Sequence, residues 1–148
     1  MRHTAHQYIF MENKFDINVR VRYAETDQMG VVYHGNYAQY FEMGRVEWLR
    51  SKGLSYRKME EMGIMLPVVS LQMDYKKPAR YDDLLTVTTI LKSQTSVKIE
   101  FNYEIRNESG DLLTTGYSML VFVDMKTGRP IVPPAEIKAI IEKYAYGL

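Results

Sequence analysis

The feature that most limits how this sequence can fold is a single long helical segment. In most of the other regular segments, apolar and polar residues alternate instead. In residues 36–51 the apolar side chains recur every three or four positions, which is the period of a helix with one buried face. The members of this stripe are Tyr37, Tyr40, Phe41, Gly44 and Trp48. Glycine is a poor helix former, so Gly44 within the stripe predicts that the helix lies close against a sheet. Asn36 is the expected N-cap and Gly53 the expected C-terminal stop.

Most of the remaining chain alternates with a period of two, as half-buried β-strands do. The first strand is expected over residues 15–23, with Tyr23 on its apolar face. Further strands are expected over residues 67–77, 84–92, 96–106 and 112–125, with short connections at 93–95 and 107–111. A short helix is expected over residues 135–144. This order predicts an α+β fold, in which an antiparallel five-stranded sheet wraps around one long central helix.

Length and composition narrow the possible functions. The 148 residues suit a single domain, with its core over residues 15–132. A net charge of +1 argues against a nucleic-acid partner, and the lack of cysteine excludes disulfides and cysteine nucleophiles. No apolar run is long enough to span a membrane, and residues 1–13 lack the apolar stretch of a signal peptide. A cytoplasmic location is therefore expected.

The familiar catalytic motifs are missing. The sequence has no G-x-S-x-G elbow, no phosphate loop, no dinucleotide fingerprint and no H-E-x-x-H motif. His3 and His6 stand at helical spacing and could bind a metal, but a loose N-terminal tail is the simpler interpretation. A metal site built from Glu25, Asp27 and His34 has no recognisable ligand spacing. We therefore predict neither a metal nor a cofactor.

The junction between the first strand and the long helix is the strongest candidate for chemistry. Asp27 precedes a turn containing Gly30, and the helix begins shortly after Gly35. The first amides of a helix have no internal partners and can hold a developing oxyanion, while an ionised aspartate facing them can attack a carbonyl or orient water. The alternative is ordinary turn chemistry, in which the Asp27 side chain accepts a backbone hydrogen bond. These residues alone leave both interpretations open.

At this junction the sequence resembles a known family. Residues 27–37, DQMGVVYHGNY, closely resemble the signature of the 4-hydroxybenzoyl-CoA thioesterase class of hotdog proteins. The likeness continues through Glu42, Arg45 and Glu47 on the helix and recurs in residues 75–83, YKKPARYDD. It looks closest to the bacterial acyl-CoA thioesterases found beside the Tol–Pal system. The resemblance implies a hotdog fold and a hydrolase that cleaves acyl-CoA into a free acid and CoA.

The likeness covers most of residues 15–132 and implies roles for several of them. Asp27 would be the catalytic carboxylate, acting as nucleophile or as general base. The backbone amides of His34 and Gly35 would polarise the thioester carbonyl. The site would be assembled across the interface of a homodimer, and such dimers often pair into a homotetramer. The stretch that would line the acyl end consists of Pro67, Val68 and Val69.

Other candidate residues each have two interpretations. Tyr33 and Tyr37 are candidates for lining the acyl channel, although core packing is the simpler interpretation of Tyr37. The His34 side chain is either a general acid or a polar group that shapes the start of the helix. Three basic residues are candidates for contacts with the CoA phosphates: Lys76, Lys77 and Arg80. Their position at an exposed strand end would explain their charge equally well.

The spacing of charges on the helix and the composition of the turn at residues 92–96 carry two further expectations. Glu42 and Arg45, three positions apart, are expected to form an ion pair at the helix surface or at an interface, and Trp48 is expected in the core. The turn at residues 92–96, KSQTS, lacks the Arg/Lys cluster with which the hydroxybenzoyl-CoA enzyme grips its nucleotide. Thr95 and Ser96 fit the general acyl-CoA branch better than the hydroxybenzoyl branch.

Three other functions compete with acyl-CoA hydrolysis. An acyl-carrier-protein thioesterase would use the same chemistry on a different thiol carrier. A non-catalytic acyl-CoA-binding module would not need Asp27. A hotdog hydratase is disfavoured, because the spacing from Asp27 to His34 is not the short Asp-to-His spacing of hydratase motifs.

Overall fold

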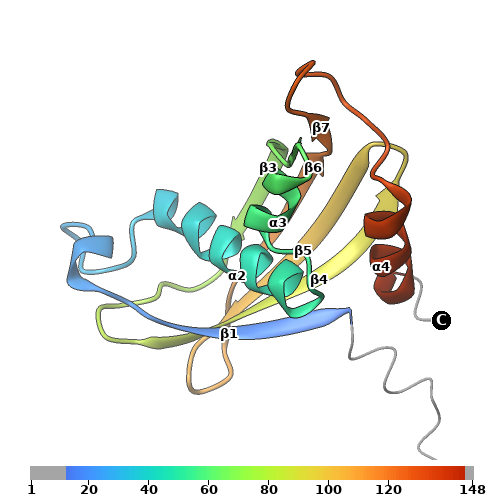
Figure 1. The fold of residues 1–148 in the computed structure, drawn as a ribbon. Helices are drawn as coiled ribbons and strands as arrows, with labels where there is room; N and C mark the ends of the chain where they lie inside the picture. Colours follow the sequence, from blue (N-terminus) through green and yellow to red (C-terminus); the bar gives the residue numbers. More distant parts are fainter. Residues whose placement is uncertain (1–12, 146–148) are drawn as a thin grey trace, which may run out of the picture.

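The computed structural model of the protein describes residues 13–145 (Figure 1). Five strands form one antiparallel sheet in the order β1-β4-β5-β6-β3. In chain order these strands are β1 (Lys14–Arg20), β3 (Val68–Tyr75), β4 (Leu84–Thr95), β5 (Lys98–Arg106) and β6 (Leu112–Val121). The long helix α2 (Tyr37–Ser51) packs on one face of the sheet. The predicted α+β architecture, a five-stranded antiparallel sheet around one long helix, is confirmed.

Two glycines allow α2 to pack closely against the sheet. A methyl group at Gly44 would collide with the Thr89 hydroxyl on β4, and one at Gly116 on β6 would collide with the Phe41 ring. Phe41 in turn stacks on Tyr103 of β5, with ring centroids 4.5 Å apart. The close approach predicted from Gly44 is confirmed, and the aromatic face of the helix, including Trp48, is fully buried.

Several elements are too short to be recognised from the spacing of apolar residues in the sequence. They are the 3-10 turns η1 (Tyr23–Glu25) and η2 (His34–Asn36), the helix α3 (Tyr56–Glu61), and the paired strands β2 (Ile64–Met65) and β7 (Val123–Asp124). The predicted C-terminal helix, α4, spans Ala135–Ala145, and it buries Ile137 and Ile141. Along residues 13–145 no helix is long and apolar enough to cross a membrane. His3 and His6 lie outside the described residues.

Two details of the predicted strands are wrong. The first strand ends at Arg20, and Tyr23 belongs to η1 with 77% of its surface exposed. The chain turns there because the amide of Glu25 donates to the carbonyl of Arg22, so the alternation no longer reflects a strand. The connection predicted at residues 93–95 is instead the paired end of β4, and the turn follows at Ser96, which adopts φ +53°.

The edge strand β3 carries the least covered apolar surface of the sheet. It pairs with β6 on one side, and no strand within residues 13–145 pairs with its other edge. Its exposed apolar residues are Val68, Val69, Leu71 and Tyr75. An open, apolar strand edge is a surface on which another chain can pair.

Candidate active site

Asp27 stands at the first position of a tight turn. Its amide donates to the carbonyl of Val31 (2.9 Å), and its carbonyl accepts from the amide of Gly30 (3.0 Å), which adopts φ +78°. Its Oδ1 accepts a hydrogen bond from the amide of Met29 (2.8 Å). The turn interpretation of Asp27 is therefore confirmed. It leaves Oδ2 without a hydrogen-bond partner among residues 13–145, so one carboxylate oxygen is available to a substrate.

The start of the long helix presents two unpaired amides. The turn η2 runs directly into α2, and the amides of His34 and Gly35 have no acceptor within the described part of the chain. Such amides carry the partial positive charge of a helix N-terminus. A β-carbon at Gly35 would lie 2.7 Å from Cε1 of Tyr33, so a larger residue there would require the Tyr33 ring to move.

Asn36 does not cap the helix as predicted. Its backbone is already helical, and its side-chain Nδ2 donates to the carbonyl of Glu25 (2.8 Å) instead of accepting from a helix amide. The same carbonyl accepts from the amide of Tyr33 (2.9 Å). Asn36 therefore ties the start of the helix to the segment that carries Asp27. At the other end of the helix Gly53 adopts φ +79°, as expected of a C-terminal stop.

Glu25 holds together the segment before Asp27 and the start of the helix, a role that the sequence did not indicate. Its carboxylate is 7% exposed and accepts hydrogen bonds from the Arg22 amide (2.8 Å), the Arg22 guanidinium (3.3 and 3.2 Å) and the Tyr40 hydroxyl (3.1 Å). Burial and the Glu25 charge raise the pKa of Tyr40, so this hydroxyl stays a neutral donor. With Glu25 engaged in this way, the alternative metal site with Asp27 and His34 finds no support, and no group of metal ligands occurs in residues 13–145.

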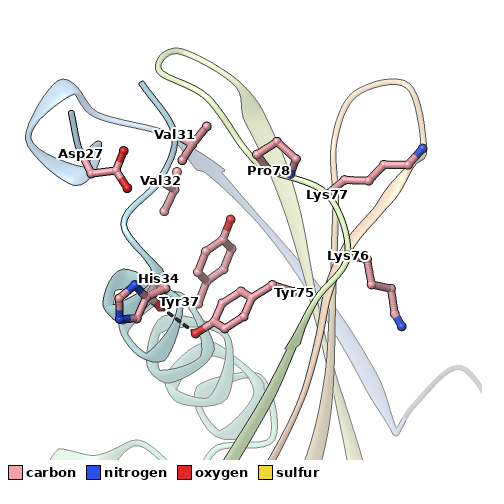
Figure 2. Close-up of a pocket in the computed structure, with 9 residues that line it drawn as sticks. All are labelled: Asp27, Val31, Val32, His34, Tyr37, Tyr75, Lys76, Lys77 and Pro78. Atoms are coloured by element: carbon pink, nitrogen blue, oxygen red, sulfur yellow. Dashed lines mark hydrogen bonds between the residues drawn. The ribbon is translucent and has the colours of Figure 1, made fainter. Parts of the chain in front are cut away.

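The Asp27 pocket has a volume of about 290 Å³ and opens between the Asp27 turn, the start of α2 and the end of β3 (Figure 2). Its lining residues are Asp27, Val31, Val32, His34, Tyr37, Tyr75, Lys76, Lys77 and Pro78. Figure 2 shows the Asp27 carboxylate turned toward the two valines. The pocket therefore joins residues from both segments that carry the sequence resemblance.

Tyr75 links the two sides of the pocket, and the sequence analysis did not single it out. Its hydroxyl donates to the carbonyl of His34 (3.0 Å), and its ring lies 5.3 Å from that of Tyr37. Burial raises the pKa of both tyrosines, so both hydroxyls are neutral at physiological pH. The position of Tyr75 within YKKPARYDD was a signal that could have identified it.

Three other candidates lie beside the Asp27 pocket. Tyr33 is about half exposed, and its ring lies 4.3 Å from the ring of His34. Gly35 follows His34 in η2. Arg80 is bridged through its backbone to Val31, and its amide donates to the carboxylate of Asp83 (2.8 Å). None of these three residues lines the pocket itself.

The lysines of the pocket extend away from Asp27. Figure 2 shows both amines pointing outward, on the side opposite the Asp27 turn. Lys77 lies 3.9 Å from the carboxylate of Asp111, a weak and exposed ion pair, while Lys76 has no ion-pair partner within residues 13–145. Both cations are thus placed at the outer rim of the pocket.

Pro67, Val68 and Val69 lie at the other end of β3. Seven residue steps separate Val68 from Tyr75, which is about 23 Å along a strand. Pro67 and Val68 line a second hollow of about 480 Å³, the Arg45 cavity, whose lining is Glu42, Arg45, Tyr56, Glu60, Ile64, Met65, Leu66, Pro67 and Val68. Within one chain, the predicted acyl-end residues and Asp27 therefore do not meet.

The ion pair predicted between Glu42 and Arg45 is wrong. Arg45 is only 6% exposed, and its guanidinium donates to the hydroxyls of Tyr56 (2.9 Å) and Tyr103 (3.1 Å). No ion pair joins Glu42 to Arg45 in the described residues. The helix turns Arg45 toward the sheet because it lies four positions after the buried Phe41, whereas Glu42 remains exposed.

Comparison with known proteins identifies the family. Residues 21–141 match the family model described as the thioesterase-like superfamily. The chain belongs to this superfamily. Acyl-CoA thioesterase YbgC of Haemophilus influenzae is 33% identical to it over 130 residues, which are 87% of this chain and 95% of that protein. This member of the thioesterase-like superfamily is accordingly a hydrolase, and the predicted thioesterase family is confirmed.

Solved structures of thioesterases agree with the fold. A DHNA-CoA thioesterase from Staphylococcus aureus superposes with a TM-score of 0.83 and 38% identity, and the match covers 89% of each chain. Slr0204, a 1,4-dihydroxy-2-naphthoyl-CoA thioesterase from Synechocystis, superposes with a TM-score of 0.80 and 27% identity, covering 86% of this chain and 95% of that one. The hotdog fold implied by the sequence is thus confirmed.

Proposed function

We propose that this thioesterase hydrolyses acyl-CoA at the Asp27 pocket. The observation that carries the proposal is that one pocket joins the free Oδ2 of Asp27 to the amide-presenting start of the long helix. A carboxylate and a pair of oxyanion donors are sufficient for acyl transfer. The similarity to acyl-CoA thioesterase YbgC supports CoA as the thiol carrier.

The mechanism follows from these groups. The amides of His34 and Gly35 bind the carbonyl oxygen and stabilise the negative charge that develops on it. Asp27 either attacks the carbonyl carbon or removes a proton from an attacking water. A carbon–oxygen bond forms, the carbon–sulfur bond breaks, and the CoA thiolate leaves and takes up a proton. If Asp27 attacks, water then hydrolyses the mixed anhydride and regenerates the carboxylate.

A homodimer would complete the site, and two dimers would form the predicted homotetramer. Antiparallel pairing of two open β3 edges about a two-fold axis places the first residue of one strand beside the last residue of the other. Val68 of the partner subunit would then lie next to Tyr75, at the Asp27 pocket. This arrangement explains how Pro67, Val68 and Val69 can line the acyl end although they lie far from Asp27 within one chain.

The remaining candidates have positions suited to the rest of the substrate. Lys76 and Lys77 point outward from the pocket, where they would meet the CoA phosphates, and Arg80 is bridged through its backbone to Val31 beside the pocket. Tyr33 and Tyr37 flank the start of the helix and would border the acyl group. The Tol–Pal branch and a cytoplasmic location stay predictions from the sequence.

A hydroxylated aromatic acyl-CoA is a second candidate substrate, because two of the similar solved proteins are named as thioesterases of such a compound. We expect free thiol to be released from one or more of short, medium, long and aromatic acyl-CoAs, with each acyl group also presented on acyl-carrier protein. Faster release from the carrier protein would favour the acyl-carrier-protein thioesterase. Binding of acyl-CoA without thiol release would favour the binding module.

His34→Ala is expected to reduce turnover less than tenfold. Losing an oxyanion donor costs on the order of a hundredfold to a thousandfold, but alanine keeps the backbone amide. The His34 side chain makes no hydrogen bond within residues 13–145, whereas its carbonyl is held by Tyr75. Turnover of His34→Ala and Asp27→Ala on one acyl-CoA is the measurement, with circular dichroism as the control for folding. Equal losses would instead indicate an Asp–His pair.

A further inference from the structure

The backbone carbonyl of His34 accepts two hydrogen bonds. The amide of Tyr37 donates to it at the end of η2, and the Tyr75 hydroxyl donates to it from the end of β3 (3.0 Å). The second bond joins residues that are 41 positions apart in the sequence. It ties the start of α2 to the edge strand of the sheet, inside the Asp27 pocket that both His34 and Tyr75 line.

The single proton of the Tyr75 hydroxyl has two acceptors within reach. Besides the His34 carbonyl, the sulfur of Met73 lies 3.2 Å from the hydroxyl oxygen. A thioether is a weak acceptor and a backbone carbonyl a strong one, so the proton is donated to His34. Burial raises the pKa of Tyr75, so the hydroxyl keeps this proton at physiological pH.

The His34 carbonyl shares a peptide plane with the amide of Gly35. Residues 13–145 contain no cis peptide bond, and in a trans peptide the carbonyl and the following amide point in opposite directions. A bond that fixes the direction of the His34 carbonyl therefore also fixes the direction of the Gly35 N–H. Figure 2 shows the Tyr75 hydroxyl on the side of His34 that faces away from Asp27, so this N–H is directed toward the Asp27 side of the pocket.

The Gly35 amide is one of the two donors that would hold the thioester oxygen. It has no acceptor within the described part of the chain, so no hydrogen bond of its own holds its direction. A hydrogen bond to the carbonyl of a peptide group also polarises that group and strengthens its N–H as a donor, by roughly 10–30%. The Tyr75 bond thus acts on the Gly35 amide through both direction and polarity.

On the basis of the proposed function, we propose that Tyr75 is a positioning residue, which aims and polarises the Gly35 amide for the thioester oxygen. The proton of the Tyr75 hydroxyl is donated to His34, so Tyr75 acts through the peptide group and does not touch the reacting atoms. Negative charge on the thioester oxygen is greatest in the transition state. The contribution of Tyr75 therefore belongs to kcat and not to KM.

Tyr75→Phe removes the hydroxyl and keeps the ring that packs on Tyr37 (5.3 Å). Loss of a whole oxyanion donor costs on the order of a hundredfold to a thousandfold, and a donor that is only weakened costs less. We expect kcat to fall by about fivefold or more, with KM within about twofold, on the acyl-CoA that the wild-type protein cleaves fastest. Tyr75 is about half exposed, so the variant folds, and light scattering checks that its oligomeric state is unchanged.

A conservative variant separates the hydrogen bond from the packing of the ring. Tyr75→4-aminophenylalanine, introduced by amber suppression, keeps an N–H donor at the same position of the ring. It should restore kcat to within about twofold of the wild-type value, because the His34 carbonyl again accepts a bond from this side chain.

Two control variants change neighbouring groups without touching this bond. Tyr81→Phe removes the same hydroxyl from an exposed tyrosine that packs on Tyr23 (5.7 Å) and does not line the Asp27 pocket. Met73→Leu removes the second acceptor and nearly conserves the side-chain volume. Both variants should keep kcat within about twofold of the wild-type value.

The outcomes distinguish this positioning role from the proposed function. A smaller fall of kcat in Tyr75→Phe, or an equal fall in Tyr81→Phe, would overturn the role of Tyr75. A rise in KM with kcat intact would make Tyr75 a substrate contact, and a loss that 4-aminophenylalanine does not restore would assign the effect to packing. In each of these cases acyl-CoA hydrolysis stands. A wild-type protein that cleaves no acyl-CoA would overturn both proposals.

Discussion

Asp27→Asn is expected to lower turnover by about a thousandfold, because general-base and nucleophilic roles both need a carboxylate. Asparagine has the same shape, and its side-chain oxygen can still accept the hydrogen bond that Met29 donates to Oδ1. The turn around Gly30 should therefore persist. Released thiol measures the activity, and unfolding in urea shows whether stability has changed.

Asp83→Asn is the matched control for this variant. Asp83 also accepts a backbone hydrogen bond, from the amide of Arg80 (2.8 Å), and it belongs to the neighbouring turn. The same chemical change should leave turnover there within about threefold, because Asp83 does not line the Asp27 pocket. A near-normal rate in Asp27→Asn, or an equal loss in both variants, would remove Asp27 from the mechanism.

Leu71→Glu is expected to dissociate the proposed homodimer and abolish most activity. Leu71 lies near the middle of β3 and is 41% exposed, so a charge is tolerated in the separate protomer. In a two-fold pair of β3 edges Leu71 lies within one residue of the axis, so the two new carboxylates come close together, and such like-charge contacts are strongly unfavourable. The dissociation constant should rise by a hundredfold or more, which is about 2.8 kcal/mol.

Light scattering and thiol release, measured on the same samples, test this expectation. Val132→Glu is the control, because Val132 is also an exposed apolar residue (54%) but lies outside β3. It should remain a fully active dimer. A Leu71→Glu monomer with wild-type turnover would show that one protomer contains the whole site.

The main fold was predictable because long elements impose their period on the sequence. The aromatic stripe of α2 and the alternation of β5 both reflect a single buried face. Short elements lack that signal, so α3 and β2 were missed, and β7 was taken for the end of the strand predicted over residues 112–125. Tyr23 continued the alternation by coincidence, since hydrogen bonds of η1 had already turned the chain.

The candidate site was predictable only where the chemistry is local. The turn bond of Asp27 and the amides that open the helix depend on neighbouring residues, and the sequence indicated both. Contacts between distant segments are different. The bond from Tyr75 to His34 and the burial of Arg45 against Tyr103 are set by tertiary packing, so the Glu42–Arg45 spacing suggested a false pair.

The central claim is that one hydrolytic site combines Asp27 of one protomer with the start of β3 of the other, and complementation tests it directly. Val68→Trp should block the acyl end, so this variant and Asp27→Asn should each be nearly inactive alone. After subunit exchange, half of the dimers are mixed and each has one intact site, so thiol release should recover to about a quarter of the wild-type rate. A mixture no more active than the two variants measured separately would contradict the account.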